Sequence, residues 1–497
     1  TATTLRIGST ATGAFTISDA MNPANITNLS LLSAAGINEL GGGSVSVTNL
    51  RIDVVTAVSM NQSNDVVTLA ANVAADGQAF SFSDNNTLQL DTVDGTTGIS
   101  TNDADITLTV NAGTLTQDTG EVIIATGLRL LVAGAITLNE ANDIDTLAAN
   151  ISGASNALQF TDADGFSVGT VGGLDGVSTS AGTITLVAST GDLTITDTDA
   201  GFDVNAGASD VALTAVANEA FVIIETDANV QGTGTNGVTV TADKMDFNGS
   251  ITATGTIVTL QPETIVDQDV VDLGSVGETT GNTLELSDAE LDNITAGVIR
   301  VGNDNTGAIN ISAAIDTQNT NSLRLTTSST VDQVAAITEQ NLAIVSGNAV
   351  TLTNTGNEIS NLAVDTASGN IQYTDATGFD VGTVDSFGGG SSAVSGVDTD
   401  NGEITLIATT GNLTASQNID SSSQNTQLTA SAGEVSQSAG SIIAAGLGVT
   451  AAGAVTLAQT GNNVTSLAID TSTGDIEFTD ADALTVGTVN VIPGVDT

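Results

Sequence analysis

One phrase recurs four times along this chain of 497 residues and constrains its fold more than any other feature. In each copy an aromatic residue is followed by Ser or Thr and then by Asp, at 82–84, 160–162, 373–375 and 478–480. A Leu-Ala pair lies upstream of every copy, at 69–70, 147–148, 362–363 and 467–468. Repeats of this kind stack one structural unit on the next and bury a continuous core. The sequence therefore predicts a repeat array, in which a single active site is not expected.

Short segments between the turns alternate apolar and polar residues. Segments 181–187 and 402–408 show this period of two, which indicates strands with one face turned inward. Hydrophobic residues make up 40% of the chain but aromatic residues only 2%, so the core is built from small and branched side chains that favour pleated strands. The 54 Gly residues, with frequent Asn and Asp, fit tight turns. We expect an all-β fold, a parallel β-helix (β-solenoid) of roughly 20–25 coils.

The repeats also set the expected domain organisation. Residues 1–18 are similar to residues 295–312, so a long internal repeat starts near 1 and again near 295. We expect one continuous β-helical array over residues 1–497, on the order of 120 Å long at about 4.8 Å per coil. A short helical interruption is expected at 287–294, because Ser287 and Glu290 have the spacing of a capping box. The last residues fall inside a repeat phrase, which predicts that the chain is part of a longer protein.

The charge of the chain excludes several classes of partner. The formal net charge is −51, from 57 acidic and six basic residues. Such a surface repels phosphate backbones and anionic lipids, so neither nucleic-acid binding nor direct membrane insertion is expected. With no Cys and no His, the chain lacks the usual ligands of zinc, haem and iron–sulfur clusters and cannot form disulfides. No cofactor is expected, with calcium as the one candidate.

Several segments together resemble a known family. They are 241–251 (TADKMDFNGSI), 257–262 (IVTLQP), 284–291 (LELSDAEL) and 299–302 (IRVG). These phrases, and the repeated ones above, resemble the large filamentous haemagglutinin-like exoproteins of two-partner secretion systems, over most of the chain. The resemblance implies a right-handed parallel β-helix. The secretion domain and the effector domain of that family are not recognisable here, so the chain resembles the repeat shaft.

The resemblance also implies a function and a location. We expect the structural shaft of a large secreted bacterial adhesin or biofilm matrix fibre, at the cell surface or outside a Gram-negative-type bacterium. The alternative is a subunit of a self-assembling extracellular filament, whose open sheet edges pair end to end. The expected partners are therefore further copies or a covalent continuation of the chain, together with a host surface, a neighbouring cell or a matrix polysaccharide.

Two pairs of carboxylates are candidates for a metal site. Asp162 with Asp164 and Asp480 with Asp482 occupy equivalent repeat positions, and hard cations prefer clustered carboxylate oxygens. The competing interpretation is that these residues cap backbone groups in solvated turns. The other two copies of the phrase lack the second Asp, since they continue as Asn85-Asn86 and Ala376-Thr377. The aromatic residues of the phrase are expected to point inward and fill the core.

An enzyme is the rival class of function, because parallel β-helices also host polysaccharide lyases and hydrolases. A pair of carboxylates at a hydrolytic spacing is inevitable among 57 acidic residues. Lyases that act on acidic sugars need a cluster of cations, and the six basic residues are scattered. Arg6 and Arg300 are equivalent in the long repeat, which favours structural pairing with nearby Asp residues. We therefore expect no enzymatic activity.

Overall fold

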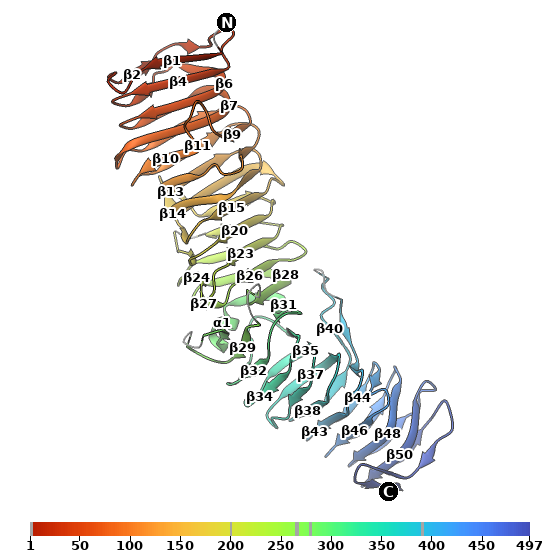
Figure 1. The fold of residues 1–497 in the computed structure, drawn as a ribbon. Helices are drawn as coiled ribbons and strands as arrows, with labels where there is room; N and C mark the ends of the chain where they lie inside the picture. Colours follow the sequence, from red (N-terminus) through yellow and green to blue (C-terminus); the bar gives the residue numbers. More distant parts are fainter. Residues whose placement is uncertain (1–2, 199–200, 264–267, 278–280, 389–391) are drawn as a thin grey trace. The chain divides into compact units, whose positions relative to one another are not determined.

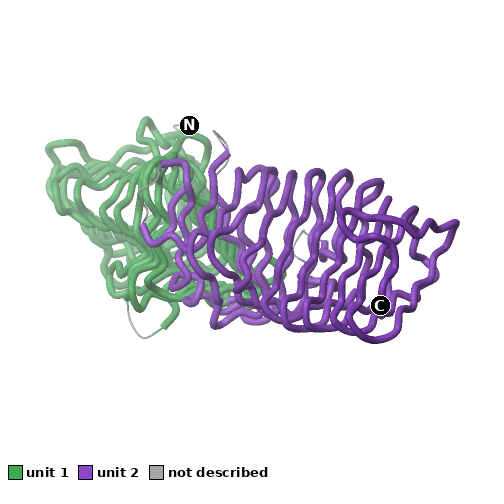
Figure 2. Tube along the Cα trace, turned by 90° about the horizontal axis from the view of Figure 1, so that it is seen from below, with its two compact units in different colours: residues 1–242, 246–252 green, residues 243–245, 253–497 purple. Residues whose placement is uncertain are grey.

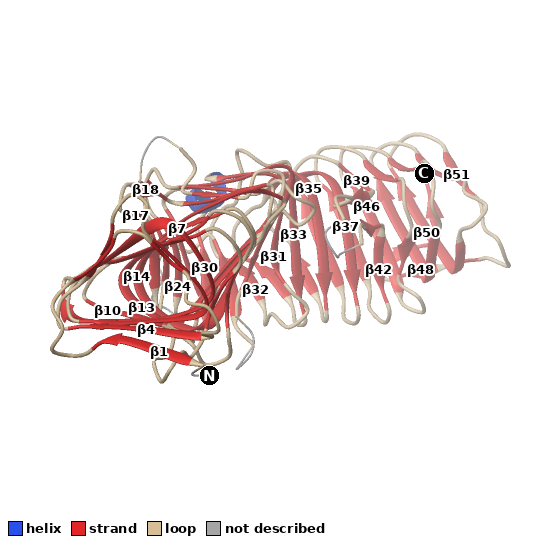
Figure 3. Cartoon of the chain, turned by 90° about the horizontal axis from the view of Figure 1, so that it is seen from above, coloured by secondary structure: helices blue, strands red, loops and turns tan. Residues whose placement is uncertain are grey.

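The fold is all-β, as the sequence predicts. The structure is a computed structural model that describes residues 3–198, 201–263, 268–277, 281–388 and 392–497. Strands make up 57% of the chain and helix 1%, and parallel strands stack into a β-solenoid of about 22 turns. Figure 3 shows the strands in red and one short helix in blue. The prediction of a parallel β-solenoid with roughly 20–25 coils is confirmed.

Apolar ladders along the stack explain why these residues form strands. The successive strands β15 (Leu158–Asp162), β20 (Ile184–Ala188), β23 (Val211–Ala215) and β26 (Val238–Thr241) pair in parallel, one coil above the next (Figure 1). Their first residues form one buried column, and the residues two positions later form a second. The intervening residues face outward, so the period of two in the sequence is the alternation between core and surface.

The chain divides into two compact units (Figure 2). Unit 1 contains residues 1–242 and 246–252, and unit 2 contains residues 243–245 and 253–497. Within each unit successive coils stack, and the single array over 1–497 stays a prediction. The long repeat has equivalent strand pairs in the two units. In unit 1, β1 (Thr4–Gly8) pairs with β4 (Asn28–Ser33), and in unit 2, β31 (Ile294–Gly302) pairs with β33 (Ser322–Thr327).

The helix α1 (Asp288–Asp292) lies inside the segment for which the sequence predicts a helical turn. Ser287 is its N-cap, and the hydroxyl of Ser287 accepts a hydrogen bond from the backbone N–H of Glu290 at 3.3 Å. In return, a carboxylate oxygen of Glu290 accepts from the backbone N–H of Ser287 at 2.7 Å. This reciprocal pair is a capping box, which satisfies two backbone donors that the first turn leaves free.

The aromatic residues of the repeated phrase face the core in three of the four copies. Phe82, Phe160 and Tyr373 are at most 1% exposed, whereas Phe478 is half-buried. The ring of Phe160 meets Phe166 edge-on with ring centres 5.2 Å apart, and Tyr373 meets Phe379 in the same way at 5.0 Å. The prediction that these rings fill the core is confirmed for these three residues.

Candidate functional site: four hairpin flaps and the arginines beneath them

The Asp residue of the repeated phrase caps the backbone of the coil before it. One carboxylate oxygen of Asp162 accepts from the N–H of Ile144 at 3.1 Å, and the other accepts from the N–H of Asp164 at 3.1 Å. Asp480 receives the same two bonds, from Val464 at 3.0 Å and Asp482 at 3.3 Å. Asp84 and Asp375 repeat this pattern. In all four copies the carboxylate joins two coils by satisfying backbone donors.

The predicted calcium pairs lie side by side, as the turn requires. Burial, together with the adjacent Asp164 carboxyl, raises the pKa of Asp162 to about 8. In the described part of the chain no three acidic side chains come together as a group able to hold a metal ion. The calcium hypothesis for Asp162, Asp164, Asp480 and Asp482 stays a prediction.

A buried Asn extends each cap over a third coil. Asn142 is fully buried, and its side chain donates to the carbonyls of Leu138 at 3.2 Å and Thr161 at 2.9 Å. Its oxygen accepts from the N–H of Ile123 at 2.9 Å and from the side chain of Gln117 at 2.6 Å. Each copy of the phrase therefore has a polar triad that spans three coils. The four triads are Glu39–Asn64–Asp84, Gln117–Asn142–Asp162, Gln333–Asn357–Asp375 and Gln437–Asn462–Asp480.

Sequence reasoning missed the triads, although a signal was present. The Asn lies 24 or 25 residues after its Glu or Gln partner. It also lies 17 or 19 residues before the Ser or Thr whose carbonyl it binds. These near-constant intervals could have identified the triads. The Asn residues were interpreted as turn residues, which is where Asn is most frequent.

A short hairpin follows each copy of the phrase and folds over an outward face of the stack. We call these hairpins flap 1 (residues 91–98), flap 2 (169–176), flap 3 (382–388 and 392–396) and flap 4 (487–494). Flap 2 is formed by β17 (Thr170–Val171) and β18 (Leu174–Asp175), flap 3 by β40 (Thr383–Val384) and β41 (Val394–Ser395), and flap 4 by β53 (Thr488–Val489) and β54 (Ile492–Pro493). Flap 1 is closed by an antiparallel bridge between Val93 and Thr96. The stacked strands β15, β20, β23 and β26, by contrast, pair in parallel.

The flaps cover small outward-facing residues. Val384 and Val394 of flap 3 pack on Ala343 and Ala363. Val489 and Ile492 of flap 4 pack on Ala468 in the same way. The Leu of each Leu-Ala pair lies in the core, Ala363 and Ala468 lie under flaps 3 and 4, and the Ala residues at 70, 148, 363 and 468 are all completely buried. The repeated pair thus marks the place where an outward residue must be small enough for a flap to close.

Arginines lie on the same faces and bind the flaps. The Nε of Arg6 donates to Asp94 of flap 1 at 2.7 Å, and the Nε of Arg300 donates to Asp385 of flap 3 at 2.7 Å. Arg324 also donates to Asp385 at 3.1 Å. The hydrogen bond from Arg6 lowers the pKa of Asp94 to about 2, and a bond from Ser30 contributes. The expected pairing of Arg6 and Arg300 with Asp residues is therefore confirmed.

The flap residue at the position of Asp94 and Asp385 has the same backbone conformation in all four copies. Asp94, Gly172, Asp385 and Asn490 have φ angles of 50°, 58°, 57° and 52°. This left-handed region is accessible to Gly and, among other residues, most readily to Asn and Asp. The four residues therefore occupy one structural position, at which the chain uses Asp, Gly, Asp and Asn.

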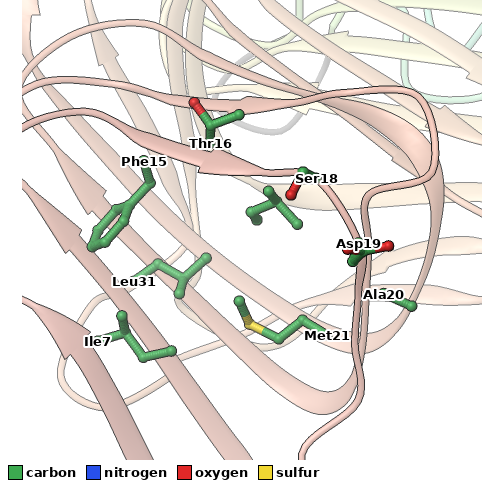
Figure 4. Close-up of a pocket in the computed structure, with 9 residues that line it drawn as sticks. Ile7, Phe15, Thr16, Ser18, Asp19, Ala20, Met21 and Leu31 are labelled. Carbon is green, nitrogen blue, oxygen red and sulfur yellow. The ribbon is translucent and has the colours of Figure 1, made fainter.

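A pocket of about 310 Å³ lies among the first strands of unit 1. Phe15, Leu31, Ile7 and Met21 face the same hollow, and Asp19 lies at its rim (Figure 4). Four of these five residues are apolar, and Thr16 and Ser18 also line the pocket. The pocket therefore continues the apolar core at the first coils of unit 1.

Comparisons with known proteins give no relative. No family model matches the chain, and neither a curated protein nor a solved structure shows significant similarity to it. Among the described residues no helix is long and apolar enough to cross a membrane.

Proposed function

We propose that this chain is the structural shaft of a large secreted bacterial surface protein, an adhesin or a biofilm matrix fibre. The observation that carries the proposal is the set of polar triads. Each triad links three consecutive coils with buried or partly buried hydrogen bonds: Asn142 accepts from Gln117 and Ile123 and donates to the carbonyl of Thr161, and Asp162 accepts from the N–H of Ile144. Buried bonds of this kind make sliding or splaying of coils costly, because every partner left behind would be a buried unsatisfied group.

The charge distribution supports the same role. Four of the six basic residues, Arg6, Arg51, Arg300 and Arg324, are in ion pairs with Asp residues. Most of the 57 acidic residues are not among the buried ones, so the exterior carries most of the net negative charge, which keeps neighbouring molecules apart and discourages lateral association of sheets. An extracellular location, two-partner secretion and the absence of enzymatic activity belong to this proposal. The self-assembling filament is its alternative.

Electron microscopy of the purified chain, with calcium and with chelator, tests the proposal. A shaft segment gives discrete rods of uniform length that survive prolonged protease treatment. Continuous filaments at the same protein concentration would favour the self-assembling alternative. Globular particles, or rapid proteolysis between coils, would contradict both.

A further inference from the structure

The position of Arg129 breaks a pattern that the other flaps obey. Where the flap residue is Asp, arginines lie beneath it, as Arg6 and Arg51 lie beneath Asp94. Beneath Asn490 of flap 4 the positions next to Val489 are Gly446 and Gly448 instead of arginines. Asn490 itself accepts a hydrogen bond from Asn425 at 2.9 Å. Flap 2 combines an arginine with a glycine. Its Arg129 pairs, in the parallel ladder, with Ala148 of the next coil, just as Arg51 pairs with Ala70 of the next coil.

Arg129 lacks the carboxylate partner that the other four arginines, Arg6, Arg51, Arg300 and Arg324, have. Its Nε is buried and has no hydrogen-bond partner, and no ion pair or hydrogen bond joins Arg129 to any residue of the described ranges. In Arg6 and Arg300 this same Nε donates to the Asp of the flap at 2.7 Å. The Nε of Arg51 also lacks a partner, but Arg51 binds Asp53 at 2.6 Å through another nitrogen.

The flap residue above Arg129 supplies no carboxylate, because it is Gly172. A Cβ on Gly172 would lie 3.1 Å from Cδ and 3.7 Å from Nε of Arg129, so a side chain there would lie against the arginine, whose stem would have to shift slightly. Gly173 follows with φ of 77°, so the connection between Val171 and Leu174 consists of two glycines. Two glycines give the tip the conformational freedom to admit a ligand.

We propose that Arg129 and the Gly172–Gly173 tip form a binding site for a small carboxylate that the chain itself does not supply. The guanidinium edge presents two parallel N–H donors, and a carboxylate accepts both at once. The other flaps fill this edge with Asp94 and Asp385. A soluble acid such as a uronic acid sugar carries the same planar group. The site is independent of the shaft function, because a shaft needs no ligand at this position.

Nitrogen-15 labelled arginine makes the site directly observable, because the chain has only five Arg residues and therefore five Nε–Hε signals. The probe is D-glucuronate, added at constant ionic strength, with D-glucose as the neutral control. We expect one signal to shift in a saturable way, and Arg129→Lys to remove that signal. Gly172→Asp should fix the signal at a new position and abolish the response, because its carboxylate occupies the site.

A reciprocal variant provides the positive control. Asp94→Gly places glycine at the equivalent position of flap 1, so the signal of Arg6 should begin to respond to glucuronate. Circular dichroism and melting curves establish that each variant is folded. The proposal is overturned if no signal of the folded wild-type protein saturates, or if folded Gly172→Asp responds as the wild type does. It is also overturned if the Arg129 signal shifts when the protein is diluted and does not shift when glucuronate is added, since the ligand would then be a second copy of the chain.

Discussion

Replacing Asn142 by Leu should open the stack locally. Leucine has a similar size, so the packing is kept, but the side chain can no longer accept from the N–H of Ile123 or donate to the carbonyl of Thr161. Each buried polar group left unsatisfied costs about 1–3 kcal/mol. Two such groups give a loss of about 3 kcal/mol, or roughly a hundredfold in the local opening equilibrium. The loss should be confined to neighbouring coils, because repeat units interact only with their neighbours.

Hydrogen exchange measured by mass spectrometry tests this expectation at the right place. Peptides containing Ile123 and Thr161 should exchange about a hundredfold faster in Asn142→Leu than in the wild type. Peptides from unit 2 should exchange as before. The matched control is Asn139→Leu, three residues away, whose exposed side chain bonds only to Gln159. It should change stability by less than about 0.5 kcal/mol. Wild-type exchange in the Asn142 variant would refute the claim that the triads join the coils.

Three further outcomes follow from the buried charges. Asp385→Asn should destabilise unit 2 by about 3–5 kcal/mol in urea unfolding, since it removes the carboxylate that pairs with two buried arginines. Asp94→Asn should cost less than about 1 kcal/mol, because Arg6, the partner of Asp94, is 60% exposed. Equal losses of stability in the two variants would contradict the claim that burial decides the strength of these ion pairs. The melting temperature should fall as the pH rises from about 4 to about 8. Burial raises the pKa of Glu339 to about 7 and that of Asp162 to about 8, whereas both ionise near pH 4 once unfolded, so the folded state loses stability as the pH rises between these values. A melting temperature that rises over this range would be inconsistent with buried protonated carboxyls. If the pair Asp480–Asp482 binds calcium, titration calorimetry should detect heat and the melting temperature should rise when calcium is added. The absence of both signals would refute the calcium hypothesis.

The fold could be predicted from the sequence because its main determinants are local. The alternation of apolar and polar residues, the turn residues and the Ser287–Glu290 spacing each act within a few positions. The repeated phrase added the long-range component, since equivalent residues in an array occupy equivalent places. The inward position of Phe160 and Tyr373 therefore followed without a structure.

The flaps could not be predicted in the same way, because they depend on contacts between distant residues. Arg6 and Asp94 are 88 positions apart, and Arg300 and Asp385 are 85 positions apart. The interval is similar in the two units but does not correspond to one coil, so periodicity did not reveal it. A local signal existed in Asp94-Gly95 and Gly172-Gly173, which are dipeptides that favour tight hairpins. The strong pattern of parallel strands outweighed it.

The four flaps separate what is constant in this structure from what varies. Flap 4 covers Ala468 with Val489 and Ile492 although no arginine lies below it. Apolar cover over the small outward residue is therefore sufficient to hold a flap, and the ion pairs of flaps 1 and 3 are additions to it. An arginine placed on this face of a chain with a net charge of −51 needs a counter-charge or a ligand. Arg129 is held where the apolar cover is complete and the counter-charge is missing, which is the arrangement expected of a site that takes its carboxylate from outside.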